Sequence, residues 1–372
     1  MIHQSRGKLL FVVTEDWYFV SHRLPLAVAA KREGFDVVVA TRCGRHCQAI
    51  RDAGVRVIPF EMNRRGLNPL ALMHEAYTLA EFYRAEQPDI VHHVALRPVV
   101  VGGLAARMAG VSRVVSAVTG MGFLFTDSGR LPWIRRVVQR ILPGLLARGL
   151  TIVQNADDQH HLSTFGLPRD RMRLIPGAGV DTARFSPSAG PGGLPVVMMA
   201  SRLLWDKGVG EFVEAARLLR GRDVRFVLVG DIDGDNPASI ANSDIERWVG
   251  EGVVEWWGHS DDMPATLAQA DLVCLPSYRE GLPKSLLEAM ACGKACITTD
   301  VPGCREAVRD DDNGLLVPAR EAAALASAIG RLLDHPDQRQ RMGVRGRQRA
   351  VEEFSQERVI EATLAVYHEV MA

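Results

Sequence analysis

Short apolar runs alternate with longer amphipathic stretches through the first half of the chain. The runs are rich in Val and Ile and lack the polar alternation of half-exposed strands, so they predict strands buried on both faces of a parallel sheet. Helical patterns such as Leu24–Glu33 and Leu70–Glu86 lie between them, and this β-α-β order predicts helices on both sides of the sheet. The predicted strands are Lys8–Thr14, Phe35–Thr41, Val55–Phe60, Asp89–Val94, Arg113–Val118 and Thr151–Gln154.

The pattern stops at a segment rich in Pro and Gly and then starts again. Residues 186–195 carry three Pro and three Gly without an apolar period, which predicts a hinge linker between a domain of residues 1–185 and a second of residues 196–355. A separate helix over residues 356–372 is predicted to pack back on the first domain. The predicted strands of the second domain are Val196–Ala200, Arg225–Val229, Val253–Trp257, Leu272–Leu275 and Ala295–Thr298, with helices at Val209–Leu219, Ala265–Ala270, Lys284–Ala291, Glu321–Leu333 and Pro336–Glu353.

The fold class that follows is α/β, with two doubly wound, Rossmann-like parallel sheets facing across a cleft. In such sheets ligands bind at the carboxyl ends of the strands, so the loops at those ends are where chemistry is expected. The length of 372 residues agrees with two domains, and a hydrophobic fraction of 47% excludes a disordered chain.

The charges balance overall but not along the chain. The 44 basic and 44 acidic residues argue against a nucleic-acid binder. Residues 1–185 hold 24 Lys and Arg against 15 Asp and Glu, a difference of +9, and the remainder holds 20 against 29, a difference of −9. This asymmetry indicates two units with different partners, although chance surface composition is an alternative.

Six cysteines offer no pattern that is typical of a metal site. Cys43 and Cys47 flank His46, but no second ligand pair follows at zinc-site spacing, so we expect six free thiols in a reducing compartment. The apolar run Leu9–Val13 has only the length of a strand, and no window of about 20 apolar residues exists. We therefore expect no signal peptide, no membrane span and a cytoplasmic location.

The segment Pro276–Met290 carries the strongest chemical signal. A buried strand ends just before it, Glu280 and Gly281 lie in the loop, and Glu288 lies on the following helix. The rise of a helix places the two carboxylates on the order of 10 Å apart, about the distance from a sugar to a ribose across a diphosphate. The first helical turn also favours anions. The alternative is structural, with Glu280 opposing the helix dipole and Glu288 solvated.

A second segment, Ala200–Gly208, follows the first strand of the second domain and precedes a helix. Arg202 and Lys207 lie in or beside this loop. Two cations next to a helix amino terminus suit a diphosphate, although single surface cations are common.

Together these two segments resemble glycosyltransferase family 4, whose members are retaining enzymes of GT-B fold that use nucleotide-sugars. Further motifs fall where that family has them: Val227–Asp231, Trp257-Gly258, Ala270-Asp271, Asn313-Gly314 and Arg339–Gly343.

The resemblance implies a role for each candidate residue of the donor site. It implies that Arg202 and Lys207 contact the donor diphosphate, that Glu280 contacts the transferred sugar and that Glu288 binds the ribose hydroxyls. Backbone groups of Gly281, Leu282 and Gly230 would lie close to the donor.

The first half matches a branch of that family more loosely. Glu15–Ala27 and Ala117–Phe125 are similar to enzymes that make capsule, O-antigen and lipid-linked oligosaccharides. The resemblance implies a UDP-linked N-acetylhexosamine or hexose and a polyprenyl-diphosphate-linked acceptor. The chain departs from the family where Asp16-Trp17-Tyr18 replaces two glycines and where Thr119 replaces a histidine. Our candidates for the cleft are Asp16, His22, His92, Thr119 and Gly120, with a structural role as the alternative for His92 and its neighbour His93.

Two further segments have competing interpretations. Asp231, Asp233 and Asp235 look like a metal site, but the neighbouring cations can neutralise a diphosphate, so we predict no metal and no cofactor. The basic, amphipathic stretch of residues 131–148 has apolar Trp133, Val137, Ile141 and Leu145 beside Arg135, Arg136, Arg140 and Arg148. It predicts contact with the inner face of the cytoplasmic membrane, or else an ordinary core-facing helix.

The function expected from these features is transfer of a sugar from a nucleoside diphosphate to a hydroxyl of a lipid-linked saccharide. Within the same class, a GDP-mannose-type transferase is the alternative. From other classes, a sugar-nucleotide 2-epimerase or a non-catalytic nucleotide-sugar-binding protein would use a similar donor site without an acceptor.

Overall fold

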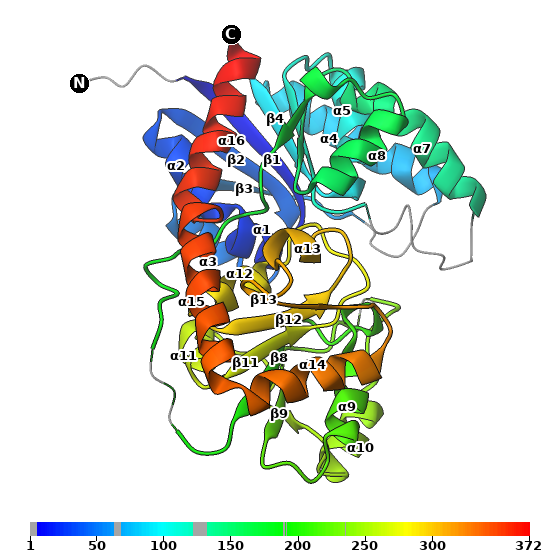
Figure 1. Ribbon diagram of the computed structural model, residues 1–372. Coiled ribbons are helices and arrows are strands. Elements are labelled where there is room, and N and C mark those ends of the chain that lie inside the picture. The colour runs from blue at the N-terminus through cyan, green and yellow to red at the C-terminus, as the bar shows by residue number, and fades with distance from the viewer. Residues whose placement is uncertain (1–5, 63–67, 122–131, 189, 191, 235) are drawn as a thin grey trace. The chain divides into compact units, whose positions relative to one another are not determined.

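The computed structural model describes the whole chain except residues 1–5, 63–67, 122–131, 189, 191 and 235 (Figure 1). Its contacts divide the chain into two compact units. The first unit comprises Met1–Ala178 and Val359–Ala372, and the second comprises Gly179–Arg358. The chain therefore crosses between the units twice. The first crossing precedes the Pro- and Gly-rich residues 186–195, so this segment belongs to the second unit.

Seven parallel strands form the sheet of the first unit, in the order β3-β2-β1-β4-β5-β6-β7. Their bounds are β1 Gly7–Glu15, β2 Phe35–Arg42, β3 Arg56–Pro59, β4 Ile90–Val94, β5 Val114–Val118, β6 Leu150–Val153 and β7 Met172–Leu174. The sequence predicts the first six. It misses β7 because this edge strand is short and includes Arg173 and the half-exposed Leu174, so it has no apolar run.

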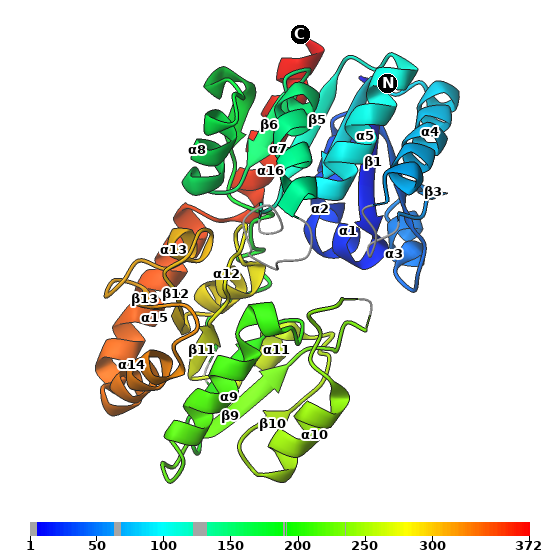
Figure 2. The same cartoon turned by 90° about the vertical axis from the view of Figure 1, so that its right-hand side faces the viewer.

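Helices cover both faces of this sheet because the side chains of β1 alternate between two cores. Leu9 and Phe11 pack under one group of helices, and Leu10 and Val12 pack under another. The first group is α1 Asp16–His22, α2 Leu24–Arg32, α3 Cys47–Asp52 and α16 Gln356–Met371. The second is α4 Pro69–Glu86 and α5 Leu96–Ala109, which lie side by side in Figure 2. Helix α7 Pro132–Leu146 lies next to α5, and α8 Ala156–Thr164 packs on β6 and β7.

Six parallel strands form the sheet of the second unit, in the order β10-β9-β8-β11-β12-β13. Their bounds are β8 Val196–Ala200, β9 Arg225–Val229, β10 Glu255–Trp256, β11 Leu272–Leu275, β12 Ala295–Thr299 and β13 Gly314–Val317. One continuous core lies around this sheet. The helices are α9 Val209–Leu218, α10 Asn242–Gly250, α11 Met263–Ala268, α12 Lys284–Ala291, α13 Cys304–Ala307, α14 Ala322–Asp334 and α15 Pro336–Glu352.

The predicted fold class, two doubly wound parallel sheets, is confirmed. In each sheet the strand order reverses at one place, between β1 and β4 in the first and between β8 and β11 in the second. Ligands of such sheets bind at the carboxyl ends of the strands beside this reversal. Within the described part of the chain, no helix is both long and apolar enough to cross a bilayer.

Candidate functional site

The loops that follow β8 and β11 press against each other at the reversal of the second sheet. Gly208, which follows the one-turn helix Trp205–Lys207, has φ +80, and a Cβ there would lie 2.1 Å from the carbonyl oxygen of Pro276. Both facts require glycine. The amide of Tyr278 donates to the carbonyl of Asp206 at 2.9 Å and so joins the two loops.

This contact brings Lys207 and Glu280 together, although they are 73 residues apart in the sequence. Lys207 Nζ lies 2.5 Å from Glu280 Oε1, and the two side chains are 20% and 11% exposed. The pair is therefore largely withdrawn from water, where charges act on each other and on a ligand more strongly than at an open surface.

A second ion pair joins the loop after β8 to the loop after β9. Arg202 Nη1 donates to Asp233 Oδ2 at 2.8 Å, and the arginine side chain is 39% exposed. Gly230, at the end of β9, has φ +134, and a Cβ there would lie 1.9 Å from the carbonyl oxygen of Ser201. Gly230 thus lets the two loops approach closely enough for the pair to form.

Helix α12 carries the remaining donor-site candidates. Glu288 lies 3.3 Å from Lys284 one turn earlier, and burial raises the pKa of Glu288 even though this lysine opposes the shift. Gly281 and Leu282 are buried just before the helix. Pro283 is the N-cap residue, and the helix begins at Lys284. A buried carboxylate of this kind favours a ligand that donates hydrogen bonds.

The aspartate run does not gather into a metal-binding cluster where the structure describes it. Asp233 is bonded to Arg202, and Asp231 Oδ2 lies 3.7 Å from His259 Nδ1. Asp235 lies outside the described residues. No group of three His, Cys, Asp or Glu side chains placed to hold a metal occurs among the described residues.

In the first unit, Asp16 follows β1 and is almost fully buried. Its carboxylate accepts three backbone N–H groups: Trp17 at 2.7 Å, Gly44 at 2.7 Å and His46 at 3.0 Å. These bonds fix the loop after β2 on the end of β1. Asp16 therefore has a clear structural role at the carboxyl edge of the first sheet.

The loop over Asp16 also corrects the expectation of six free thiols. Cys43 and Cys47 form a disulfide across this loop, with their Cα atoms 5.5 Å apart. The turn that wraps the Asp16 carboxylate brings the two sulfurs together, which spacing alone does not reveal. The other four cysteines are free and buried: Cys274, Cys292, Cys296 and Cys304.

His92 and His93 lie fully buried on β4. His92 Nδ1 is 2.6 Å from the hydroxyl of Tyr367 on α16, and His93 Nε2 is 2.9 Å from the hydroxyl of Tyr83 on α4. Burial lowers the pKa of both, that of His93 to about 3, so both imidazoles are neutral. The structure thus places His92 in the core of the first unit, and this placement favours the structural alternative.

The other candidates of the first unit are partly exposed. His22 is the last residue of α1, and its ring stacks on Tyr18 with centroids 4.1 Å apart. Thr119 and Gly120 follow β5, and Gly120 has φ +125. Thr119 and Gly120 therefore lie at the carboxyl edge of the first sheet.

The amphipathic stretch forms α7, and two members of the predicted apolar stripe, Ile141 and Leu145, can be compared with the structure. Leu142 and Leu145 are buried, whereas Ile141 is 40% exposed. Arg136 and Arg140 are exposed. The side chains of Trp133, Arg135 and Val137 lie outside the described residues. Helix α7 therefore packs on the core and also presents arginines to solvent.

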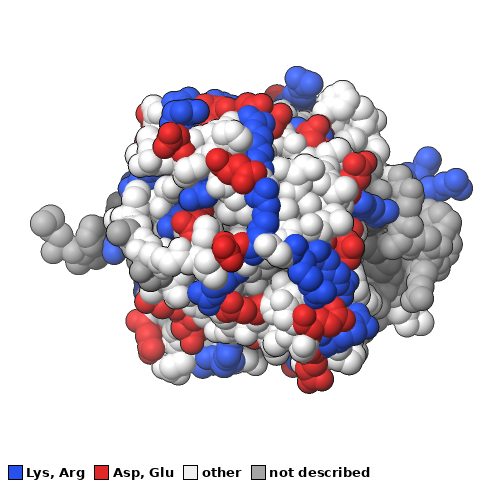
Figure 3. All heavy atoms as spheres, turned by 60° about the horizontal axis from the view of Figure 1, so that its bottom comes forward, with Lys and Arg blue, Asp and Glu red and all other residues white. Residues whose placement is uncertain are grey.

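Acidic and basic side chains are interspersed on the face of the molecule that Figure 3 shows. Ion pairs of the second unit include Arg217 with Glu214 and Glu251, and Arg222 with Asp334.

Comparisons with known proteins identify the family of the chain. Residues 194–335 match a family model described as glycosyl transferases group 1, and residues 8–148 match one described as glycosyl transferase 4-like. The two ranges span more than half of the chain. The protein is a family 4 glycosyltransferase.

Two relatives show what this transferase is similar to. One, from Campylobacter jejuni, is named N,N'-diacetylbacillosaminyl-diphospho-undecaprenol alpha-1,3-N-acetylgalactosaminyltransferase, and it is 30% identical over 328 residues, covering 84% of this chain and 85% of the relative. The other, from Escherichia coli, is named UDP-Gal:alpha-D-GlcNAc-diphosphoundecaprenol alpha-1,3-galactosyltransferase, and it is 26% identical over 317 residues, covering 81% of each chain.

A solved structure shows the fold type. HepE of Anabaena in complex with UDP and glucose matches with a TM-score of 0.80 at 19% identity, over 98% of this chain and 100% of HepE. The transferase therefore has the GT-B fold.

The sequence analysis did not single out two residues that contact side chains in or beside the candidate loops. Asp233 is the counter-ion of Arg202, and Tyr278 donates its hydroxyl to Glu211 at 2.7 Å while the Arg320 guanidinium lies 4.6 Å from its ring centroid. Their place in the sequence could have indicated them, because Asp233 and Tyr278 both follow strands of the second sheet at its carboxyl edge.

Proposed function

We propose that this transferase moves an N-acetylhexosamine or hexose from UDP to a hydroxyl of a polyprenyl-diphosphate-linked saccharide, with retention at the anomeric carbon. The observation that carries the proposal is the Lys207–Glu280 pair beside Arg202, at the strand-order reversal of the second sheet. The names of two relatives, which contain diphospho-undecaprenol or diphosphoundecaprenol, support the acceptor class.

The reaction needs stabilisation of the charge that develops on the departing diphosphate. Lys207 and Arg202 would supply it, because cations held in a partly dry site act strongly on such charge. Glu280 would position the sugar, and backbone groups of Gly281 and Leu282 would lie beside it. With two cations and the amino terminus of α12 available, neutralisation of the leaving group requires no metal ion.

Glu288 would bind the ribose of the nucleotide. Its side chain is 12% exposed, and this burial raises the pKa of the carboxyl group. A poorly solvated carboxylate gains from hydroxyl groups that donate to it. The two hydroxyls of a ribose are such donors. Gly230 would line the same donor site through its backbone at the end of β9.

The first unit would bind the acceptor and face the membrane. Residues 1–185 carry a charge difference of +9, and Arg136 and Arg140 are exposed on α7. Such charges are attracted to anionic headgroups and to the diphosphate of a lipid carrier. We place the transferase at the inner face of the cytoplasmic membrane, as a peripheral protein. Thr119, Gly120 and His22 are the proposed acceptor-side residues.

A thermal-shift titration with UDP-, GDP- and dTDP-sugars, followed by radiolabel transfer to a bacterial lipid extract, tests the proposal. We expect a UDP-sugar to raise the unfolding temperature of the wild type, a Lys207→Ala control to lose this shift, and label to enter the lipid fraction. A shift with GDP-mannose alone contradicts the assigned donor. An altered sugar on intact nucleotide without acceptor indicates epimerase activity instead, and no shift with any nucleotide-sugar contradicts the donor site itself.

A further inference from the structure

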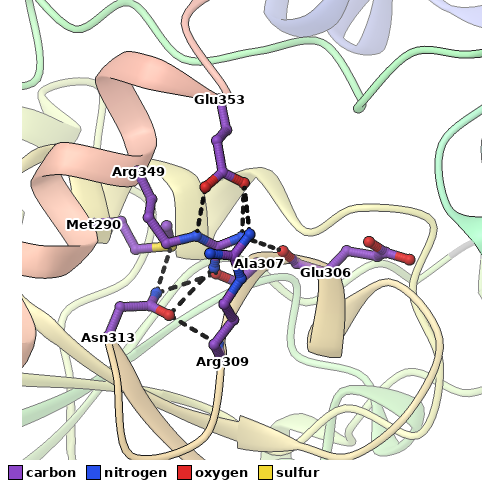
Figure 4. Close-up of polar contacts among 7 residues, drawn as sticks. All are labelled: Met290, Glu306, Ala307, Arg309, Asn313, Arg349 and Glu353. Atoms are coloured by element: carbon purple, nitrogen blue, oxygen red, sulfur yellow. Dashed lines mark hydrogen bonds and ion pairs between the residues drawn. The ribbon is translucent and has the colours of Figure 1, made fainter.

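Arg349 is a buried cation outside the donor site. It lies near the end of α15 and is 4% exposed. Its guanidinium makes a bidentate pair with Glu353, with Nε at 3.0 Å and Nη2 at 2.9 Å from the two carboxylate oxygens (Figure 4). The pair lowers the pKa of Glu353, so the carboxylate remains charged.

The same guanidinium reaches the carboxyl end of the short helix α13. Arg349 Nη1 donates to the carbonyl of Ala307 at 2.7 Å, and Nη2 donates to the carbonyl of Glu306 at 3.1 Å. Figure 4 shows these carbonyls and the Glu353 carboxylate arranged around one guanidinium. A planar fork of donors thus fixes α13 relative to the end of α15.

Asn313 completes the cluster from the loop before β13 and is fully buried. Its Oδ1 accepts from Arg349 Nη1 at 3.2 Å and from the amide of Arg309 at 2.8 Å, while its Nδ2 donates to the carbonyl of Ala307 at 3.1 Å. Arg349, Glu353 and Asn313 therefore tie three segments together at α13. We name these three residues the α13 clamp.

The opposite end of α13 lies against the loop that carries Glu280. Gly303 is the N-cap residue of α13, with φ +81, and a Cβ there would lie 2.5 Å from the carbonyl oxygens of both Glu280 and Gly281. The amide of Glu280 donates to the carbonyl of Pro302 at 3.2 Å. The backbone of the proposed sugar-binding loop thus rests on the amino end of α13.

The α13 clamp also lies next to a chain crossing. Directly after Glu353, the carbonyl of Phe354 accepts from the amide of Val180, and the carbonyl of Val180 accepts from the amide of Gln356, each at 2.9 Å. The segments on both sides of this bridge lead to the two crossings between the units. The clamp thus connects the paired crossing segments to α13, and α13 connects to the Glu280 loop.

A buried ion pair is often no better for stability than apolar residues of similar volume, so stability alone does not account for this cluster. What a guanidinium adds is fixed geometry, because each donor has one acceptor. We propose that Arg349, with Asn313 and Glu353, is a positioning residue that sets the backbone of Glu280 and Gly281 through α13. The inference rests on the proposed function only in assigning Glu280 to the sugar.

Weakening the α13 clamp is expected to affect the sugar half of the donor site more than the nucleotide half. Lys207, Arg202 and Glu288 lie on other loops or on α12, so the nucleotide sites remain. We expect Arg349→Lys to lower kcat/KM for the UDP-sugar about tenfold or more, while the Kd of UDP stays within about threefold. The matched control is Arg345→Met, one turn earlier on α15, where an exposed arginine pairs with Asp312. It should leave both quantities unchanged.

A second measurement follows α13 without using activity. Cys304 is the first residue of α13 and is fully buried, and burial raises the pKa of its thiol to about 12. Labelling with a thiol reagent, quantified for each peptide by mass spectrometry, should therefore be slow in the wild type. It should become about tenfold faster in Arg349→Lys but not in Arg345→Met, since a freed α13 exposes this thiol more often. Cys274, on β11, is the internal reference.

The outcomes separate the two proposals. Wild-type kcat/KM together with wild-type Cys304 labelling in Arg349→Lys overturns the positioning role. An equal loss of UDP affinity and turnover, in proportion to the loss of folded protein, also overturns it, because that pattern reports stability only. If the wild type binds no UDP, the proposed function fails, and Cys304 labelling still decides whether the clamp holds α13. If Arg349→Lys does not fold, Asn313→Ala, which leaves the Arg349–Glu353 pair in place, is measured in the same way.

Discussion

The carboxyl edges of the two sheets satisfy their charges in different ways. In the second unit, Lys207 pairs with Glu280 and Arg202 pairs with Asp233, each through side chains from different loops. In the first unit, the Asp16 carboxylate accepts three backbone N–H groups. In the core of that unit, His92 on β4 is neutral and bonded to a buried tyrosine.

This difference shows which edge can exchange its partners for a ligand. A side-chain ion pair can open when a diphosphate arrives, because both groups can rotate and the cation gains a new anion. Three backbone donors around one carboxylate cannot open without unfolding the loop that carries them. The second edge is therefore suited to binding a charged substrate, and Asp16 is suited to holding the first edge in shape.

The largest expected effect is the loss of turnover when the Lys207–Glu280 ion pair is broken. We expect Lys207→Ala and Glu280→Gln each to lower kcat about 100-fold or more, since each removes a charge that would act on the transition state. Steady-state transfer with purified, folded variants measures this. Arg217→Ala, which removes the ion pairs with Glu214 and Glu251 on the same unit, is the control. Wild-type kcat in both site variants would end the assignment.

Tyr367→Phe is expected to affect the stability of the first unit and not its chemistry. It leaves buried His92 Nδ1 without its hydrogen bond, which costs about 1–3 kcal/mol of unfolding free energy. Urea denaturation gives the free energy, and kcat per folded molecule should equal that of the wild type. A large fall in kcat with unchanged stability would instead return His92 to the active site.

Asp16→Asn tests whether Asp16 only supports its loop. We expect about 1–2 kcal/mol of destabilisation, because an amide carries one acceptor oxygen where the carboxylate uses two. We also expect a severalfold rise in the acceptor KM with unchanged UDP binding. Calorimetry with UDP and acceptor titrations separate these effects. Loss of UDP affinity would break the distinction between the two edges.

Glu86 provides a smaller, pH-dependent effect at the opposite edge of the first sheet. Hydrogen bonding from the Arg56 guanidinium lowers the pKa of Glu86 from 4.5 to about 2. A lowered pKa in the folded state contributes stability that is complete above about pH 4.5 and is lost as the pH falls towards 2. Glu86→Gln should cost less than about 1 kcal/mol at pH 7, because exposed pairs are screened. The difference in unfolding free energy between the wild type and Glu86→Gln should shrink as denaturation is repeated from pH 7 down to pH 2.5. A difference that stays constant over this range contradicts the explanation.

The smallest expected effect is that of chelation. Because Asp233 is engaged by Arg202 and cations are available for the diphosphate, dialysis against EDTA should leave turnover unchanged. Loss of turnover that manganese restores would make the aspartate run a metal site.

The sequence predicts the strands and most helices well because their apolar runs are unambiguous. It misses Gly314–Val317, which has only three apolar side chains and begins within the turn signal Asn313-Gly314, and Met172–Leu174 at the sheet edge. It also predicts which loops of the second unit carry the donor candidates.

What the sequence cannot predict are contacts between distant residues. Tyr367 lies 275 residues from His92, and the Asp233–Arg202 pair depends on two loops meeting beside Gly230. The Cys43–Cys47 bond likewise depends on the loop around Asp16. Local patterns determine the elements, whereas these pairings are decided by the packing of elements that are remote along the chain.

The return of the last helix to the first unit has a consequence for biosynthesis. Val359, Leu364, Val366 and Tyr367 belong to the same core as Leu9 and Phe11. That core cannot be completed on the ribosome until α16 has been translated, whereas the second unit is contiguous in sequence and is synthesised before α16 is complete. The first unit therefore remains incomplete until α16 has been made, and loss of α16 would uncover part of one apolar face of the first sheet.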